Sequence, residues 1–259
     1  ETRSTMKVVI NGGGGVGEVL ADILRHEQHD VTLVEQSPSR VAALQERLDC
    51  RVLTGSGSTP PMLREAGANE CDVFLAVSDS DEVNLFSCVV ARKMGCPRTV
   101  ARVREPGFRI DDPGVPGGEL GIDQIINPDE EAAQEILRLL RNPGTTQVIP
   151  LAGGSVIVAG IAVPADSPLD GRTLADLHEA HGNLRYRVVV IRRDDHAIIP
   201  SGQNRIQAGD EIFVVAQPDA VKRIAAIVGR KPGPRELGRV MILGANDLGR
   251  YVAELLETE

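Results

Sequence analysis

The sequence predicts an α/β protein: a doubly wound parallel sheet of Rossmann type, then a small α+β unit, then the start of a second Rossmann unit. Three features support this fold class. Short β-branched runs alternate with helical patterns, a glycine-rich turn follows the first run, and the opening segment recurs near residue 240. At 259 residues the chain fits two folded units, because domains commonly hold roughly 100–200 residues.

The first predicted domain, residues 6–144, contains six short and almost continuously apolar runs. Such runs are typical of parallel strands that are covered on both faces. They lie at residues 7–10, 31–34, 51–54, 73–77, 99–103 and 124–126. Helical patterns separate them, and Ser37-Pro38 and Thr59-Pro60 each combine an N-cap side chain with a proline suited to a first helical turn. This alternation predicts a right-handed, doubly wound sheet.

The second predicted domain, residues 148–230, has a different pattern of strands and helices and follows the helix-breaking Asn142-Pro143-Gly144. Strands are predicted at 156–163, 186–192, 197–200 and 211–216, with a closing helix at 219–228. Thr173 and Asp176 have the spacing of a capping box, which predicts a short helix. A proline-glycine linker at residues 231–234 ends this α+β domain.

The end of the chain repeats its beginning. Residues 240–249 match residues 8–17, so that Gly244 corresponds to Gly12 and Gly249 to Gly17, while Asn246 replaces Gly14. We interpret residues 238–259 as the first strand and helix of a second, incomplete Rossmann unit, and we expect the parent protein to be roughly twice as long. The apolar face at 248–256 should therefore be disordered, pack on the first domain, or pair with another chain.

Charge and composition exclude several classes of protein. A net charge of -9 argues against a nucleic-acid partner, because phosphate binding needs a basic surface. No apolar run reaches the roughly 18–20 residues that cross a bilayer, and no secretory leader opens the chain, so we expect a cytoplasmic protein. The four cysteines form no Cys-x-x-Cys pair and are expected to be small buried groups, since disulfides are rare in a reducing cytosol.

A nucleotide site is predicted at the glycine-rich turn. Gly12-x-Gly14-x-x-Gly17 ends a strand and opens a helix, which is the context this fingerprint requires. Gly12 permits a tight turn, Gly14 lets the backbone approach a pyrophosphate, and Gly17 lets helix and strand pack closely. The N–H groups at the start of the helix would then bind the phosphates. The alternative is a structural turn that binds nothing.

Three further positions extend the predicted site. Glu35 ends the second strand and can accept hydrogen bonds from both ribose hydroxyls, which favours NAD(H) or an adenine nucleotide over NADP(H). The segment Ser78-Asp79-Ser80-Asp81-Glu82 follows the fourth strand, where its short polar side chains could reach phosphate or ribose and its acidic ones could hold a cation. The alternative is an ordinary cap for the helix that starts near Asp81. Arg102 lies inside a strand and needs a partner, either a ligand phosphate or a carboxylate such as Glu35.

Several segments resemble the RCK (KTN) family, and within it the regulatory subunits of Trk potassium uptake systems. The resemblance covers residues 6–259. It is most specific at 55–60, 63–68, 76–84, 100–104, 198–202 and 208–210.

The resemblance implies a cytosolic regulatory protein on the inner face of the plasma membrane. Such proteins form homo-oligomeric rings beneath a Trk-type potassium-translocating membrane subunit and gate it by binding NAD(H) or ATP/ADP. The implied contacts are Gly12, Gly13, Gly14, Gly15, Val16, Glu35, Ser56, Ser78, Asp79 and Arg102.

No catalytic or metal-binding residue is predicted. The runner-up function, an NAD-dependent oxidoreductase, would need a general acid or base beside the nicotinamide. Residues 148–229 offer only scattered carboxylates and the pair His178 and His181, which lies where a helix is predicted to end and lacks an obvious third metal ligand. A scaffold that has lost its ligand is the remaining alternative.

Overall fold

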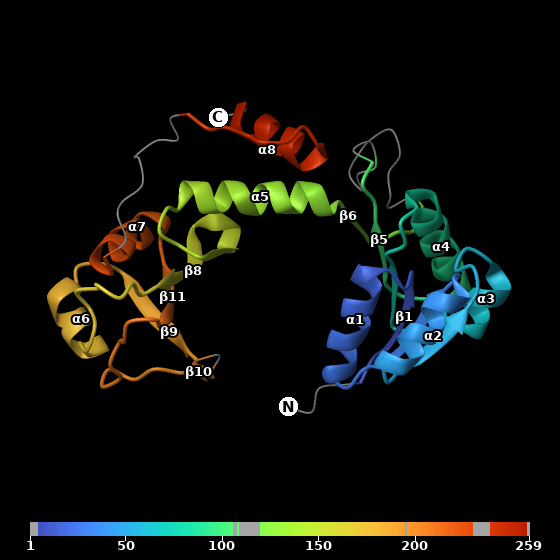
Figure 1. Ribbon diagram of the computed structural model, residues 1–259, viewed down its shortest axis with the longest axis horizontal. Helices are drawn as coiled ribbons and strands as arrows, with labels where there is room; N and C mark the ends of the chain where they lie inside the picture. The colour runs from blue at the N-terminus through green and yellow to red at the C-terminus, as the bar shows by residue number, and fades with distance from the viewer. Residues whose placement is uncertain (1–4, 106–107, 109–119, 195, 230–238, 258–259) are drawn as a thin grey trace. The chain divides into compact units, whose positions relative to one another are not determined.

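The computed structural model describes residues 5–105, 108, 120–194, 196–229 and 239–257. The chain divides between Glu131 and Ala132 into two compact units (Figure 1). The predicted linker at residues 231–234 lies outside the described residues.

The first unit contains a six-stranded parallel sheet, which confirms the predicted Rossmann fold class. Its strands are β1 (Lys7–Asn11), β2 (Asp30–Glu35), β3 (Arg51–Thr54), β4 (Val73–Ala76), β5 (Thr99–Arg102) and β6 (Gln124–Ile126). Their order in the sheet is β3-β2-β1-β4-β5-β6, and every pairing is parallel. The order reverses between β1 and β4, which is the switch point where open α/β sheets bind ligands.

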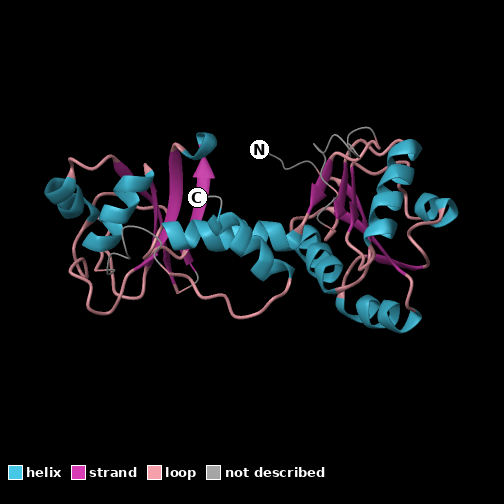
Figure 2. Cartoon of the chain, turned by 90° about the horizontal axis from the view of Figure 1, so that it is seen from above, coloured by secondary structure: helices cyan, strands magenta, loops and turns pink. Residues whose placement is uncertain are grey.

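Helices cover both faces of this sheet (Figure 2). They are α1 (Gly15–His26), α2 (Pro38–Arg47), α3 (Pro60–Glu65) and α4 (Asp81–Met94). Successive side chains of β1 point to opposite faces. Val8 and Ile10 therefore join a buried cluster with α1 and α2, while Val9 joins a second cluster with α3 and α4.

The helix starts agree with the predicted positions, but two caps differ from expectation. Ser37 and Thr59 occupy the N-cap positions of α2 and α3, followed by proline, yet neither hydroxyl accepts a hydrogen bond from a backbone N–H of its helix. The Thr59 hydroxyl donates instead to the Ser56 carbonyl, 3.0 Å away, so it stabilises the preceding loop. Ser80, which belongs to the segment whose alternative interpretation was a helix cap, accepts a hydrogen bond from the Val83 N–H and begins α4.

The second unit contains a five-stranded antiparallel sheet in the order β10-β9-β11-β8-β7. Its strands are β7 (Gln147–Leu151), β8 (Val156–Ala162), β9 (Tyr186–Arg193), β10 (His196–Ile198) and β11 (Glu211–Ala216). All but β7 were predicted. Pro150 argues against a strand, but β7 lies at the sheet edge and pairs only with β8, which is a position where proline is tolerated. A 3-10 turn, Ala152–Gly154, joins β7 to β8.

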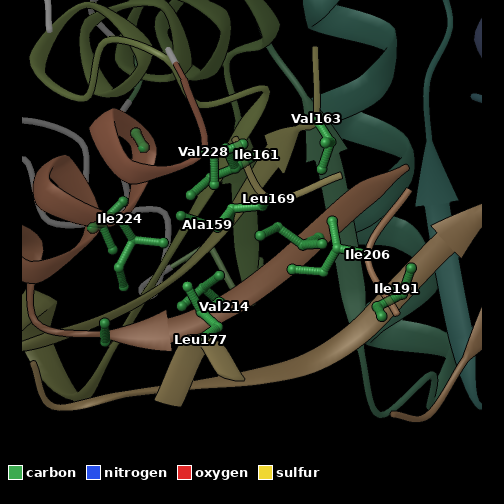
Figure 3. Close-up of a cluster of buried hydrophobic side chains, with 14 of the residues drawn as sticks. Ala159, Ile161, Val163, Leu169, Leu177, Ile191, Ile206, Val214, Ile224 and Val228 are labelled. Carbon is green, nitrogen blue, oxygen red and sulfur yellow. The ribbon is translucent and has the colours of Figure 1, made fainter. Parts of the chain in front are cut away.

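One apolar core holds this second unit together (Figure 3). Ile161, Ile191 and Val214 extend from three of its strands and meet Leu177 of α6 (Leu174–His181) and Ile224 of α7 (Pro218–Ile227). The helix α5 (Pro128–Arg141) crosses the boundary between the units, and its Leu139 packs against the same core. No helix in the described part of the chain has the length and apolar character needed to cross a bilayer.

The predicted capping box at the start of α6 is present. The Asp176 N–H donates to the Thr173 hydroxyl at 3.1 Å, and the Thr173 N–H donates to the Asp176 carboxylate at 2.9 Å. The hydrogen bond from the Thr173 N–H to the Asp176 carboxylate, together with the Thr173 side chain, lowers the pKa of Asp176. We expect Thr173→Ala to lower the free energy of unfolding of the second unit by about 1 kcal/mol, measured by urea denaturation, because one cap is lost. Thr173→Ser keeps the hydroxyl and should retain nearly all of that free energy of unfolding. An equal loss of stability in Thr173→Ala and Thr173→Ser would contradict a capping role.

The C-terminal repeat folds only in part as predicted. Helix α8 (Asp247–Glu257) forms, but the strand expected at residues 240–243 is absent from both sheets, and the side chains of Met241 and Leu243 are 91% and 99% exposed. A strand needs a hydrogen-bonded neighbour, and no described strand pairs with this segment.

The apolar face of α8 packs within the second unit. Tyr251 and Val252 bury themselves against Ala133 of α5, and the apolar residues beside them are partly covered; these are Leu248, Leu255 and Leu256. The face is therefore ordered, and it packs on a helix that the sequence assigned to the first domain.

Candidate nucleotide-binding site

A cleft of about 480 Å³ opens in the first unit at the carboxyl ends of β1, β2, β4 and β5. Nine of the eleven predicted site residues line it: Gly12, Gly14, Gly15, Val16, Glu35, Ser56, Ser78, Asp79 and Arg102. Gly13 and Gly17 do not. The volume lies within the range of small-molecule sites.

The glycine turn has the geometry that its fingerprint predicts. Gly12 has a φ of +111°, and a Cβ there would lie 2.6 Å from the Ser78 nitrogen. A Cβ on Gly17 would lie 1.8 Å from the Gly12 carbonyl oxygen, so only glycine allows α1 to approach β1 this closely. Gly13 is turned away from the cleft, toward Leu44 and Glu35.

Gly14 faces open space, because a Cβ built on it meets no atom within 4 Å. It is also the N-cap of α1, and no side chain caps that helix. The first N–H groups of a helix have no partner within it and carry a partial positive charge. The start of α1 therefore offers unpaired donors to an anion in the cleft.

Glu35 is held in place by two backbone groups. Its Oε2 accepts a hydrogen bond from the Gly13 N–H at 2.9 Å, and its Oε1 accepts one from the Ser37 N–H at 2.8 Å. Each carboxylate oxygen can accept a second bond, so the group remains able to bind ribose hydroxyls. Arg40, which could attract a 2′-phosphate, donates to the Gly13 carbonyl and lies 3.8 Å from the Glu18 carboxylate.

Asn84, which the sequence did not single out, joins the two strand ends that carry Ser78 and Arg102. It is fully buried. Its Oδ1 accepts hydrogen bonds from the Ser78 N–H at 2.9 Å and the Ser78 hydroxyl at 2.7 Å, while its Nδ2 donates to the carbonyls of Ser78 and Arg102 at 3.0 and 2.9 Å. Asn84 therefore uses its whole amide group to fix the floor of the cleft.

A second buried contact supports the loop at Ser56, which lines the cleft. The Asn11 amide donates to the Ser87 hydroxyl at 3.1 Å. A Cβ on Gly57 would lie 1.8 Å from the Asn11 oxygen, so the loop approaches β1 only with glycine at that position. Sequence spacing could not reveal these contacts, because they join residues far apart in the chain.

Among the predicted acidic residues, those on α4 act as structural groups. Asp81 accepts hydrogen bonds from the N–H groups of Arg104 and Glu105, both at 2.9 Å, and Glu82 accepts one from the Ser80 hydroxyl at 2.8 Å. Hydrogen bonding also lowers the pKa of Glu82. The described residues hold no cluster of three or more metal-ligating side chains. Asp79 alone of these acids lines the cleft.

Arg102 lies in the cleft wall with a buried Nε that has no hydrogen-bond partner among the described residues. Burial lowers its pKa, as does the neighbouring Arg104, while Asp81 and Asp79 act in the opposite direction. No ion pair joins Arg102 to Glu35 among the described residues, and the Glu35 oxygens accept hydrogen bonds from the Gly13 and Ser37 N–H groups. An anion in the cleft would stabilise the charged guanidinium.

Comparisons with known proteins agree with this architecture. A TrkA-N domain model matches residues 8–128, and a TrkA-C domain model matches residues 158–229. A protein of Methanothermobacter thermautotrophicus named "Trk system potassium uptake protein TrkA homolog" is 33% identical over 84% of this chain and 96% of its own. The "Trk system potassium uptake protein TrkA" of Halomonas elongata is 34% identical over 97% of this chain and 55% of its own length.

Two solved structures share the fold. The "GsuK RCK domain" superposes with a TM-score of 0.65 and 17% identity, over 99% of this chain and 54% of that one. The "GsuK channel bound to NAD" superposes with a TM-score of 0.65 and 16% identity, over 100% of this chain and 45% of that one.

The Rossmann sheet with a glycine-lined cleft, followed by a small antiparallel unit, gives this chain the fold of RCK domains. The chain belongs to the TrkA family of Trk system potassium uptake proteins. It spans about half the length of several curated relatives that it matches.

Proposed function

We propose that this chain is a nucleotide-binding regulatory subunit that gates a Trk-type potassium-translocating membrane protein. NAD(H) or ATP/ADP binds in the cleft at Gly12–Val16, Glu35, Ser56, Ser78, Asp79 and Arg102. The observation that carries the proposal is the cleft itself, which is lined by the uncapped start of α1 and by Arg102, whose buried Nε has no hydrogen-bond partner among the described residues.

Each part of a nucleotide has a suitable partner in the cleft. The open face of Gly14 and the N–H groups of α1 suit a pyrophosphate. The Glu35 carboxylate suits the ribose hydroxyls of NAD(H), ATP or ADP and opposes a 2′-phosphate. Arg102 and Arg104 line the same cleft and suit a further phosphate. The name of the GsuK structure, which states that NAD is bound, supports NAD as one ligand.

Gating requires that the ligands prefer different conformations, because a ligand shifts an equilibrium only by its differential affinity. A roughly hundredfold preference corresponds to about 2.7 kcal/mol, enough to change a gate from mostly closed to mostly open. The γ-phosphate of ATP can supply such a difference by binding Arg102, which ADP does not reach. The names of the relatives, which are potassium uptake proteins, support the translocating partner.

We further propose that the protein acts as a homo-oligomeric ring on the cytoplasmic face of the membrane. The α1 side chains Val16, Val19 and Ile23 are 42%, 57% and 51% exposed, and they form an apolar strip that a second copy would cover. Light scattering of the purified chain at tens of micromolar should report an oligomer, and a strict monomer would contradict this part of the proposal.

The competing function is that of an NAD-dependent oxidoreductase. Consumption of NADH distinguishes this enzyme from the proposed regulatory subunit. The regulatory proposal expects that NADH binds and is never consumed. Calorimetric titration with NADH, NAD⁺, ATP and ADP should give micromolar affinity, and potassium flux through the reconstituted partner should respond to the same nucleotides. Stoichiometric oxidation of NADH with a small-molecule acceptor would overturn the proposal.

Glu35→Ala should weaken NADH binding by roughly ten- to a hundredfold, because losing hydrogen bonds to a charged group costs about 1.5–3 kcal/mol. The unmodified protein should bind NADPH much more weakly than NADH, since a 2′-phosphate would meet the Glu35 carboxylate. Arg40→Ala is the matched control at the cleft rim, and it should leave the preference for NADH intact. Equal affinity for NADH and NADPH in the unmodified protein would exclude the assigned role of Glu35.

A further inference from the structure

Two cysteines in the first unit lie in direct contact, although they are 25 positions apart. Cys71 precedes β4, Cys96 precedes β5, and their Sγ atoms are 3.1 Å apart. A disulfide bond is about 2.05 Å long, so closing it requires a movement of about 1 Å. Both residues lie in connections and not in the strands themselves, where such a movement breaks no ladder hydrogen bond.

We propose that Cys71 and Cys96 form a redox-responsive dithiol that a hydroperoxide converts into an intramolecular disulfide. Both cysteines are free thiols in this structure. The site is separate from the nucleotide cleft, because it lies at the amino-terminal ends of β4 and β5, while the cleft lies at their carboxyl ends.

The contact makes the two thiols unequal. Cys71 donates its S–H hydrogen bond to the Cys96 sulfur. That bond lowers the pKa of Cys96 to about 7, and it raises the pKa of Cys71 together with burial. The Arg92 guanidinium, which donates to the Cys96 carbonyl at 3.3 Å, adds positive charge beside Cys96. A thiolate is the reactive form of cysteine, so Cys96 is the attacking group and Cys71 the resolving one.

The reaction balances with one hydroperoxide. The Cys96 thiolate attacks the terminal peroxide oxygen, the O–O bond breaks, and Cys96 becomes a sulfenic acid while the leaving oxygen takes up a proton. The Cys71 sulfur then attacks the Cys96 sulfur, loses its proton, and displaces water. Two thiols are oxidised and hydrogen peroxide is reduced to two molecules of water.

The two thiols are buried, but they lie in chain segments whose neighbouring residues are exposed. Cys71 and Cys96 are only 4% and 1% exposed, which disfavours their oxidation by a bulky disulfide reagent. The residues next to each cysteine are exposed: Glu70 and Asp72 beside Cys71, and Gly95 and Pro97 beside Cys96. A small hydroperoxide is therefore the oxidant that suits this pair. Cys88 belongs to the same buried cluster but lies within α4, and burial raises its pKa to about 12.

The test treats the full chain with hydrogen peroxide. The intact mass should fall by about 2 Da, maleimide should then label two of the four cysteines, and peptide mapping should show one cross-link between Cys71 and Cys96. Dithiothreitol should restore all four thiols. The reaction should accelerate as pH rises toward neutrality, because the hydrogen bond from Cys71 lowers the pKa of Cys96 and a larger share of Cys96 is then thiolate. A disulfide between molecules, a cross-link at another pair, or oxygen addition without the mass loss would overturn the proposal.

Two variants separate the roles of the two thiols. Cys71→Ser should lose the disulfide and accumulate a Cys96 sulfenic acid that dimedone captures, whereas Cys96→Ser should give no adduct at Cys71. Cys50→Ser, which alters a half-buried cysteine outside the pair, is the control and should oxidise as the unmodified protein does. In the unmodified protein oxidation should also raise Tm by on the order of 5–10 °C, since the cross-link restrains the unfolded chain. An unchanged or lower Tm would contradict the inferred geometry.

Discussion

Gly14→Asp should lower the affinity for NADH and ATP at least about a hundredfold while the fold remains intact. The new side chain fits without strain, because Gly14 has an ordinary negative φ of -63° and nothing lies within 4 Å of its Cβ position. Aspartate at an N-cap stabilises a helix by a few tenths of a kcal/mol relative to glycine. Its charge would occupy the phosphate position at the start of α1, and like charges in contact cost several kcal/mol.

Calorimetry and thermal denaturation together measure this effect. Gly14→Asp should lose binding with an equal or slightly higher Tm, and potassium flux through the reconstituted partner should stop responding to nucleotide. Gly14→Ser is the matched control, since it caps α1 without charge and should bind within about tenfold of the unmodified protein. If Gly14→Asp bound NADH within threefold of the unmodified affinity, the start of α1 would not be the phosphate site.

The second large effect is expected in the core of the second unit. Asp210 is 1% exposed, and its carboxylate accepts hydrogen bonds from Nε and Nη2 of Arg193 at 2.7 and 2.8 Å and from the Gln207 N–H at 2.8 Å. The contact with Asp210 also raises the pKa of Arg193. Removing one partner of a buried pair costs about 3–5 kcal/mol. Because Arg193 is partly exposed, we expect Asp210→Asn to cost about 3 kcal/mol.

Urea denaturation followed by circular dichroism measures this loss. Asp166→Asn makes the same chemical change at an exposed position, where the carboxylate has no hydrogen-bond or ion-pair partner among the described residues, and it should cost less than about 0.5 kcal/mol. Because the nucleotide cleft is formed by the first unit alone, Asp210→Asn should leave NADH affinity unchanged wherever the protein is folded. If Asp210→Asn lowered the free energy of unfolding by less than about 1 kcal/mol, water would be solvating Arg193 in place of the carboxylate and the ion pair would contribute little to stability.

The fold was predictable wherever hydrophobic period and local chemistry agree. The runs at 51–54, 124–126 and 211–216 became strands with the predicted bounds. The prediction missed β7, where the local signal of Pro150 opposes a strand and only its place at the sheet edge permits one. It placed a strand at 240–243, where the local pattern is correct but no neighbouring strand provides hydrogen bonds.

The candidate site likewise combines features that local sequence determines with features that depend on the folded sheet. Gly12, Gly14 and Gly17 follow one another in a single turn, so their spacing carries the geometry. Asn84 and Asn11 escaped notice because their partners, Ser78 and Ser87 among others, are brought close only by the folded sheet. A buried asparagine on an amphipathic helix resembles any other polar residue until its contacts are known.

The amide of Asn84 has a consequence for how the cleft responds to parts of a ligand. The Asn84 side chain is hydrogen-bonded both to Ser78 and to the backbone of Arg102. A ligand group that binds at Ser78 should therefore change the free energy of binding a second ligand group at Arg102. Neighbouring groups that share a partner show interaction energies of about 0.5–3 kcal/mol. A double-mutant cycle on Ser78 and Arg102 should therefore be non-additive for ATP, and the cycle should become additive once Asn84 is replaced by alanine.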